Sequence, residues 1–365
     1  MSLSAGATLD LSLVGDEGSD FDLYIYDSST DDITSDPSVV NSRGETYPEV
    51  LTYTVPAGQG GTYYVDICAY SESGSYTLEY TITSPPAEPV TVPIEGPNRY
   101  ATAIAASTKA FPSGSEYVII ATGMNWPDAL GGSALAGALD APILLTRQDI
   151  LPAEVRSEIV RLGATKAIIL GGTPAVSAAV AGQIDGIAGV SVERISGPNR
   201  YDTANAVAAR TIAVMRAGSG YDGTAFIATG ANFPDALGAS PLAAAAGWPI
   251  YLANPNQDNN AGLVAVMKAA GVTDAILLGG ANVVADSIRI ALGTAYETRL
   301  SGANRYDTAI AVATYGVANA GLSWNRLAIA TGQNFPDALA GGVLQGKSGS
   351  VLLLTPTASL NDGVR

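Results

Sequence analysis

The stretch ATGANFPDALGAS, from Ala228 to Ser240, decides how this 365-residue chain is built, because close copies of it begin at Ala121 and Ala330. A second string precedes each copy and reads GPNRYATA, GPNRYDTA or GANRYDTA. The arginines of this second string, Arg99, Arg200 and Arg305, lie 101 and 105 residues apart. A repeat of that length is the size of a small domain, so we expect tandem domains rather than the short turns of a solenoid.

Each repeat combines short apolar runs with helical patterns. In the first repeat, EYVIIATG, APILLT and TKAIILGG read as buried strands. The segments between them, such as LPAEVRSEIVRLG with its stop at Gly163, have apolar residues at helical spacing. Near-continuous Val, Ile and Leu in strands that alternate with helices predict α/β modules with parallel sheets. The third repeat stops after SVLLLT without an LGG strand, which we expect to leave an apolar sheet edge open.

The first 83 residues have a period of two instead. TLDLSLVG, DFDLYIYD, GTYYVDICAY and GSYTLEYTI alternate apolar with polar residues, which predicts an antiparallel β-sandwich or jelly-roll. The same alternation predicts that Cys68, the single cysteine, is a buried structural thiol. We therefore expect five segments: a β-domain over 1–83, a Pro-rich linker over 84–93, and repeats over 94–193, 194–298 and 299–365.

Charge and composition exclude several functions. Residues 1–95 carry 16 of the 34 acidic residues but only one of the 18 basic residues, so the net charge of −16 belongs almost wholly to this front segment. No basic block would attract nucleic acid. The absence of histidine excludes His-dependent triads and His-ligated metals, and no paired carboxylates repeat, so we expect no enzyme. No apolar run is long enough to span a membrane. MSLSAGATLD lacks the features of a signal peptide, so we expect an internal fragment that begins with an expression start.

An acidic cluster in the β-domain leaves two interpretations open. Asp16, Glu17, Asp20 and Asp22 surround one predicted turn, and carboxylates at that density can hold Ca²⁺. A solvated acidic loop is the interpretation we favour, because no complete calcium-loop spacing is present. Apart from this candidate calcium ion, we expect no cofactor.

The repeated motifs supply the candidate binding residues. In each NFPDAL-type string, Pro fits the first helical position and the following Asp suits the helix dipole. The Asn before the aromatic residue lies near the carboxyl end of a strand, where α/β sheets bind ligands. The Arg of NRY offers a planar fork for a carboxylate or phosphate, although it could equally pair with the Asp of the other motif and hold modules together. These candidates are Asn125, Asn232, Asn334, Asp128, Asp235, Asp337, Arg99, Arg200 and Arg305.

At these residues the chain resembles the cell wall-binding repeat type 2 family, through RISGPNRYDTA, ATGANFPDAL, PILLT and IILGG. The resemblance implies a secreted Gram-positive surface protein whose three modules gather about a pseudo-threefold axis. It implies non-covalent anchoring to an anionic wall polysaccharide or teichoic-acid-like polymer, with the arginines on polymer charge and the Asn and Asp side chains on hydroxyls or bracing the arginines. The first copy departs from the family pattern, because VPIEG stands where RISG is expected.

The front segment resembles the bacterial pre-peptidase C-terminal domain, through DFDLYIYD, TVPAGQGGTYYVDICAY and GSYTLEYTI. Two alternatives to wall anchoring follow. One is an adhesin that binds a host or matrix ligand through the β-domain. The other is the non-catalytic part of a secreted wall hydrolase or protease.

Overall fold

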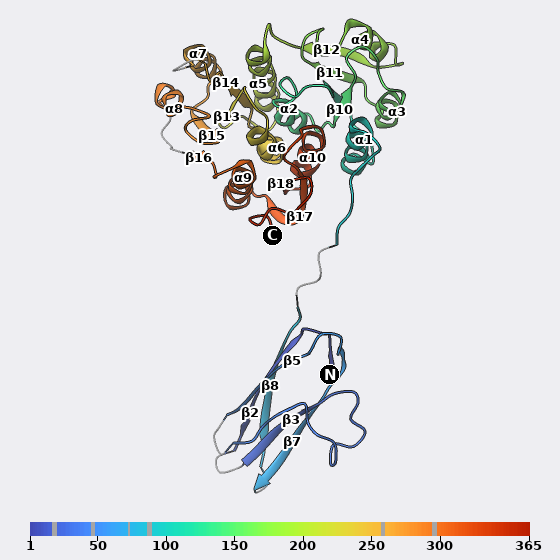
Figure 1. The fold of residues 1–365 in the computed structure, drawn as a ribbon, viewed down its shortest axis with the longest axis vertical. Helices are drawn as coiled ribbons and strands as arrows, with labels where there is room; N and C mark the ends of the chain where they lie inside the picture. Colours follow the sequence, from blue (N-terminus) through green and yellow to red (C-terminus); the bar gives the residue numbers. More distant parts are fainter. Residues whose placement is uncertain (17–19, 45–47, 72–73, 86–89, 257–259, 294–297) are drawn as a thin grey trace. The chain divides into compact units, whose positions relative to one another are not determined.

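The computed structural model describes residues 1–365 except 17–19, 45–47, 72–73, 86–89, 257–259 and 294–297. The chain divides into two compact units, Met1–Val92 and Pro93–Arg365 (Figure 1). Each unit has its own apolar core and is described by itself. None of the helices in the described part of the chain is long and apolar enough to cross a membrane.

The first unit consists of antiparallel strands, as its period-two sequence predicts. Two three-stranded sheets have the orders β5-β2-β8 and β4-β3-β7, and a short pair joins β1 to β6. The strands are β1 (Ser2–Leu3), β2 (Thr8–Gly15), β3 (Asp20–Tyr26), β4 (Val40–Ser42), β5 (Glu49–Thr54), β6 (Gly61–Thr62), β7 (Tyr64–Ser71) and β8 (Tyr76–Thr83). Alternate residues of β2 and β3 point into one shared apolar core, which contains Leu9, Leu11, Leu13, Phe21, Leu23 and Ile25.

Cys68 is exposed, so the expectation of a buried thiol is wrong. On β7 it lies opposite Asp22, while its neighbour Ile67 lies opposite the buried Leu23. Alternation therefore places Ile67 on the core side of the sheet and Cys68 on the outer side. The thiol donates a hydrogen bond to Asp66 (3.1 Å), and this bond, with desolvation, raises the pKa of Cys68 to about 11.

The second unit contains three α/β repeats with parallel sheets. The first two sheets have four strands each, in the orders β10-β9-β11-β12 and β14-β13-β15-β16, and the third pairs β17 with β18. The strands are β9 (Tyr117–Thr122), β10 (Ile143–Thr146), β11 (Lys166–Leu170), β12 (Ser191–Ile195), β13 (Thr224–Thr229), β14 (Ile250–Ala253), β15 (Asp274–Leu278), β16 (Thr298–Leu300), β17 (Ser323–Thr331) and β18 (Ser350–Thr355). On β17, Leu327 and Ile329 stay 39% and 48% exposed, because no described strand pairs with its outer edge.

Helices precede and follow these strands. They are α1 (Arg99–Ala110), α2 (Gly132–Ala138), α3 (Ala153–Leu162), α4 (Ala178–Asp185), α5 (Arg200–Ala217), α6 (Pro234–Ala246), α7 (Ala261–Ala269), α8 (Asp286–Leu292), α9 (Arg305–Asn319) and α10 (Pro336–Lys347). Proline begins α6 and α10 as predicted, and Gly163 ends α3 in the left-handed conformation. In the first repeat, however, the helix begins only at Gly132.

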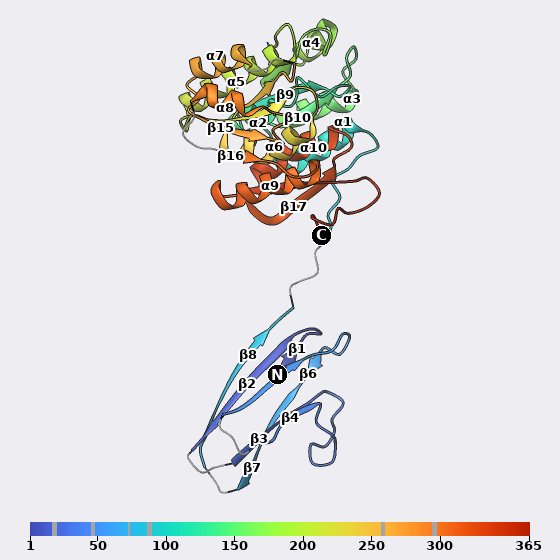
Figure 2. The ribbon, with the colours of Figure 1, turned by 60° about the vertical axis from the view of Figure 1, so that its left-hand side comes forward.

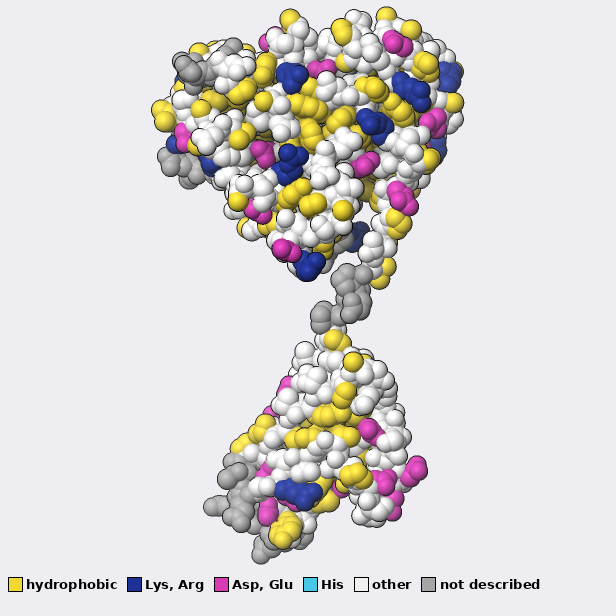
Figure 3. All heavy atoms as spheres, viewed as in Figure 1, with side chains coloured by type: hydrophobic (Ala, Val, Ile, Leu, Met, Phe, Trp, Pro, Cys, Tyr) yellow, Lys and Arg dark blue, Asp and Glu magenta, His cyan; other side chains and the backbone are white. Residues whose placement is uncertain are grey.

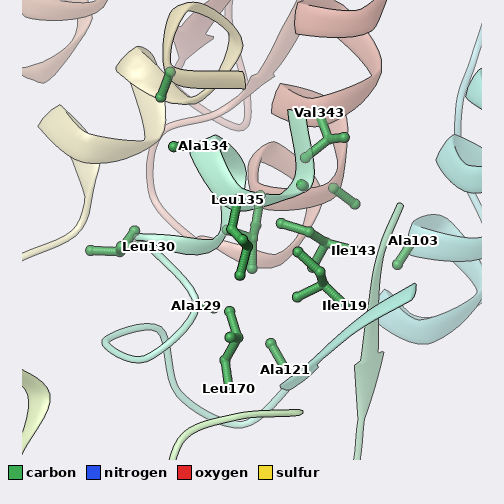
Figure 4. Close-up of a cluster of buried hydrophobic side chains, with 14 of the residues drawn as sticks. Ala103, Ile119, Ala121, Ala129, Leu130, Ala134, Leu135, Ile143, Leu170 and Val343 are labelled. Carbon is green, nitrogen blue, oxygen red and sulfur yellow. The ribbon is translucent and has the colours of Figure 1, made fainter. Parts of the chain in front are cut away.

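Helices α2, α6 and α10, one from each repeat, contact one another pairwise at the centre of the second unit (Figures 1 and 2). The small residues of these helices allow the close approach: a Cβ on Gly137 of α2 would lie 2.5 Å from the carbonyl carbon of Ala244 in α6. Around them, α5 packs on α2, α9 on α6 and α1 on α10. The helix that opens each repeat therefore packs on the central helix of another repeat, and the contacts form a closed ring. Figure 4 shows part of the apolar core of this unit, to which Leu135 of α2, Ile143 of β10 and Val343 of α10 all belong.

Candidate functional site

The NRY motifs begin the helices α1, α5 and α9. In each, an Asn (Asn98, Asn199 or Asn304) caps the helix by accepting hydrogen bonds from two backbone N–H groups. The Arg that follows donates from Nη1 to the carbonyl of the Thr-Gly glycine in its own repeat. These pairs are Arg99 with Gly123, Arg200 with Gly230 (2.8 Å) and Arg305 with Gly332 (2.6 Å). Each guanidinium is thereby held at the carboxyl end of a strand.

The same guanidinium groups lie over aromatic rings of a different repeat. Arg200 of the second repeat is 5.0 Å from the centre of the Trp126 ring in the first. Arg305 of the third repeat is 6.0 Å from Phe233 in the second. Arg99 of the first repeat closes the cycle, at 5.9 Å from Phe335 in the third. These are cation–π distances, so each Arg joins the NRY motif of one repeat to the NFPDAL-type motif of another.

The Phe233 ring also approaches the other two aromatic rings. Trp126 and Phe233 have ring centres 6.0 Å apart, and Phe233 and Phe335 have centres 6.2 Å apart with edge-to-face geometry. Edge-to-face aromatic pairs are favourable beyond the area they bury. The aromatic residue of the motif therefore helps to join the repeats, a role that spacing alone did not reveal.

The Asp of each motif faces the same Arg. Burial raises the pKa of Asp128 and of Asp235, while the nearby Arg200 and Arg305, respectively, oppose the shift. The pKa of Asp337 is also raised by burial and opposed by Arg99. Within the described ranges, none of these pairs comes within ion-pair distance of 4.0 Å. We call each such contact between two repeats a junction: the Arg of one repeat with the aromatic residue and the Asp of another. Each Asp thus attracts the Arg across its junction without covering the hydrogen-bond donors of the guanidinium.

The motif asparagines lie at the surface. The side-chain oxygen of Asn125, Asn232 and Asn334 accepts a hydrogen bond from the backbone N–H of the next residue, at 2.9–3.0 Å. Among the described residues no partner accepts from their Nδ2 groups. The amide N–H donors therefore face solvent.

The structure also explains why Ala101 replaces the Asp of the other two copies. Asp202 and Asp307 accept from the Nδ2 of the capping Asn199 and Asn304, at 2.7 and 2.9 Å. This contact only supports a cap whose main hydrogen bonds Asn98 makes in the same way. The Asp is therefore an accessory to the cap rather than a part of the junction.

Sequence reasoning missed the role of a second pair of arginines. Arg194 donates to the carbonyl of Gly171 (2.7 Å), and Arg299 donates to that of Gly279 (2.6 Å) and to the Asp286 carboxylate (2.7 Å). Both lie on the last strand of a sheet, so the Arg of RISG closes the repeat before it rather than opening the next. No repeat precedes the first copy, which accounts for VPIEG at that place. Arg194 and Arg299 recur in the sequence at the repeat period, and this recurrence could have indicated that they share a role.

The acidic residues of the first unit do not gather into a metal site in the part of the chain that the structure describes. Asp16 accepts from the backbone N–H and the hydroxyl of Ser75, both at 2.8 Å, and these bonds lower its pKa. Asp22 is 8% exposed and accepts from the Tyr24 hydroxyl. Asp20 lies opposite Ser71, and Glu17 lies outside the described residues.

On the face of the second unit that Figure 3 shows, basic side chains are spread out rather than gathered. Two small apolar crevices between helices, one lined by Ala106 and Val343 and the other by Leu242 and Val312, have no room for a water molecule.

Known proteins share these repeats. The model of the family "Cell wall binding domain 2 (CWB2)" matches residues 94–181, 194–289 and 299–364. The chain is 35% identical over 272 residues to the N-acetylmuramoyl-L-alanine amidase LytC of Bacillus subtilis, covering 74% of this chain and 51% of that protein. It is 28% identical over 272 residues to the amidase enhancer of the same organism, covering 74% and 35%. The chain thus spans about half or less of these curated relatives.

Two solved structures have the same fold. Cwp6 from Clostridium difficile superposes with a TM-score of 0.66 at 22% identity, covering 98% of this chain and 61% of that one. Cwp8 from the same organism gives a TM-score of 0.63 at 27% identity, covering 74% and 45%. The family match places this protein at the cell wall, on the surface of the cell. Its relatives named above come from the Gram-positive bacteria Bacillus subtilis and Clostridium difficile. The chain belongs to the cell wall binding domain 2 family, of which it carries three copies.

Proposed function

We propose that the three repeats anchor a surface protein non-covalently to an anionic polymer of the cell wall, a polysaccharide or a teichoic-acid-like chain. In this proposal the modules gather about a pseudo-threefold axis, and each junction presents one Arg. The observation that carries the proposal is the state of those guanidinium groups. Each donates one hydrogen bond to a glycine carbonyl and, among the described residues, has no ion-pair partner.

The junction suits an oxyanion for physical reasons. The aromatic ring and the glycine carbonyl fix the plane of the guanidinium, which lowers the entropy lost when a ligand binds. The remaining N–H donors match the geometry of a carboxylate or phosphate. The Asp across the junction braces Arg99, Arg200 or Arg305, and the exposed amides of Asn125, Asn232 and Asn334 would donate to polymer hydroxyls.

Weak single contacts are sufficient here. A polymer that engages one junction meets the next at a high local concentration, so linked sites raise the overall affinity without any new contact. Three near-identical junctions on one rigid unit fit a ligand that is itself repetitive.

The similarity of these repeats to segments of two amidase-related proteins favours a second candidate function. The amidase and the amidase enhancer named above carry matching segments, and the matched length corresponds to the second unit. This chain would then be the binding part of a secreted wall hydrolase, with no catalytic step in the repeats. A third candidate is an adhesin whose first unit, a pre-peptidase C-terminal-like β-sandwich, binds a host or matrix ligand. Calcium binding near Asp16, Asp20 and Asp22 stays a prediction, testable by calorimetric titration with Ca²⁺.

Sedimentation with purified cell walls tests the proposal. We expect the full chain to sediment with walls and to stay in solution when anionic polymers have been stripped from them. The triple variant Arg99→Lys, Arg200→Lys, Arg305→Lys keeps the charge but loses the planar fork, so its binding should weaken. The matched control is Arg326→Lys, an exposed Arg outside the junctions. Unchanged binding by the triple variant would refute the role of the junctions, and binding to stripped walls would refute an anionic ligand.

A further inference from the structure

The three junctions differ at one position beside the Thr-Gly turn. In each repeat the glycine N–H of this turn donates to the last residue of the neighbouring strand: Gly123 to Thr146, Gly230 to Ala253 and Gly332 to Thr355, all at 2.8 Å. The residue that follows this acceptor therefore lies next to the glycine that holds the junction Arg. It is Arg147 in the first repeat, Asn254 in the second and Pro356 in the third.

Arg147 adds a second guanidinium only to the junction that Arg99 forms with Phe335, between the first and third repeats. Its side chain is exposed, and its Cζ lies 5.7 Å from the centre of the Tyr100 ring. Tyr100 follows Arg99, and a Cβ on Gly123 would lie 2.8 Å from Tyr100 Cε1 and 3.2 Å from Arg99 Cδ. Arg99 and Arg147 thus flank the same tyrosine and the same turn.

Neither guanidinium forms an ion pair within the described part of the chain, although the Asp337 carboxylate attracts Arg99 from beyond ion-pair distance. Arg99 bonds only to a glycine carbonyl, and Arg147 has no hydrogen-bond or ion-pair partner among the described residues. Glu95 and Asp149 are close in sequence but form no ion pair with them. The acid at the third helical position is also missing here, since Ala101 replaces it. Two neighbouring positive charges that form no ion pair bind an anion more strongly than one does.

In the other repeats this position is already used or apolar. The side-chain oxygen of Asn254 accepts from the backbone N–H of Asn256 (3.0 Å), and the backbone N–H of Asn254 donates to the side-chain oxygen of Asn260 (2.7 Å). Pro356 has no donor at all. The second and third junctions therefore offer one Arg each.

We propose that the junction between the third and first repeats is the principal oxyanion site of this protein, where Arg99 and Arg147 together hold one phosphate or carboxylate group of the wall polymer. This inference rests on the proposed wall binding. The other two junctions then act as weaker, auxiliary contacts along the same chain.

The test compares Arg147→Asn, which gives the first repeat the residue of the second, with Arg326→Asn. Arg326 is exposed and has φ of 58°, a conformation that Asn tolerates, so the control makes the same chemical change away from the junctions. In sedimentation of the full chain with walls over a range of concentrations, Arg147→Asn should lower the apparent affinity about tenfold, as expected for loss of a charge-assisted hydrogen bond. Arg326→Asn should leave it unchanged.

A transfer variant makes the test independent of any damage to the first repeat. Pro356→Arg in the Arg147→Asn background places a second guanidinium at the third turn and should recover a large part of the lost affinity. Walls treated to remove phosphate polymers, or with carboxylates chemically amidated, show which oxyanion is held.

The outcomes separate the two proposals. Equal affinities of native protein and Arg147→Asn, with binding intact, would overturn the principal site and leave wall anchoring standing. Failure of the native chain to sediment with untreated walls would overturn both.

Discussion

Replacing Gly137 by Ala tests the contact between the first two repeats directly. The added Cβ would lie 2.5 Å from the carbonyl carbon and 2.7 Å from the Cα of Ala244, and closer still to the carbonyl oxygen. All three are backbone atoms of α6, so no side chain can rotate away. Ordinary carbon contacts need about 3.5 Å, so the carbonyl carbon alone requires the two helices to separate by about 1 Å, and the closer oxygen requires more.

The size of the effect follows from two opposing terms. Overpacking of a close-packed interior costs about 1–3 kcal/mol, and rigid backbone on both sides indicates the upper end. Ala in place of Gly within a helix returns about 1 kcal/mol through helix propensity. We expect Gly137→Ala to lower the free energy of unfolding by about 2 kcal/mol. The matched control is Gly182→Ala in α4, where a Cβ meets nothing within 4 Å, and it should raise that free energy by up to about 1 kcal/mol.

Urea unfolding followed by tryptophan fluorescence measures both. The three tryptophans, Trp126, Trp248 and Trp324, lie in the second unit, so the signal reports the repeats alone. A Gly137→Ala protein as stable as Gly182→Ala would show that α2 and α6 do not pack this closely, and the ring of repeats would lose its main support.

Three further predictions follow from individual residues. Burial raises the pKa of Asp128 above 3.8, so the contribution of Asp128 to stability is complete below that pH and is lost as pH rises through the folded pKa. We expect Asp128→Asn to flatten this fall in the free energy of unfolding, measured by urea unfolding from about pH 4 to 7. An unchanged slope would contradict the prediction. Arg194→Ala leaves the carbonyl of Gly171 without its partner and should cost about 2 kcal/mol in the same assay, whereas no loss would show that the RISG arginine is dispensable. With its pKa raised to about 11, Cys68 should react about a hundredfold more slowly with a thiol reagent at pH 8 than free cysteine does; equal rates would contradict the Asp66 hydrogen bond.

The sequence predicted the repeats and their parallel sheets because long apolar strands and repeated caps are local signals. The first Pro of α6 and the stop of α3 at Gly163 are of this kind. The partner of each Arg was not predictable, because Arg200 is near both Gly230 of its own repeat and Trp126 of another, and spacing along the chain does not distinguish copies. Cys68 was misplaced because strand alternation tells which residues share a face but not which face is inside.

Arg99 against Phe335, together with the ion pair between Lys347 and Asp140, ties the last repeat to the first. In a linear array, an end unit can be lost at the expense of a single interface. Here every repeat contacts both of the others, so deleting one repeat would expose two interfaces at once. The three repeats should therefore melt together, and copies should be gained or lost in sets of three rather than singly.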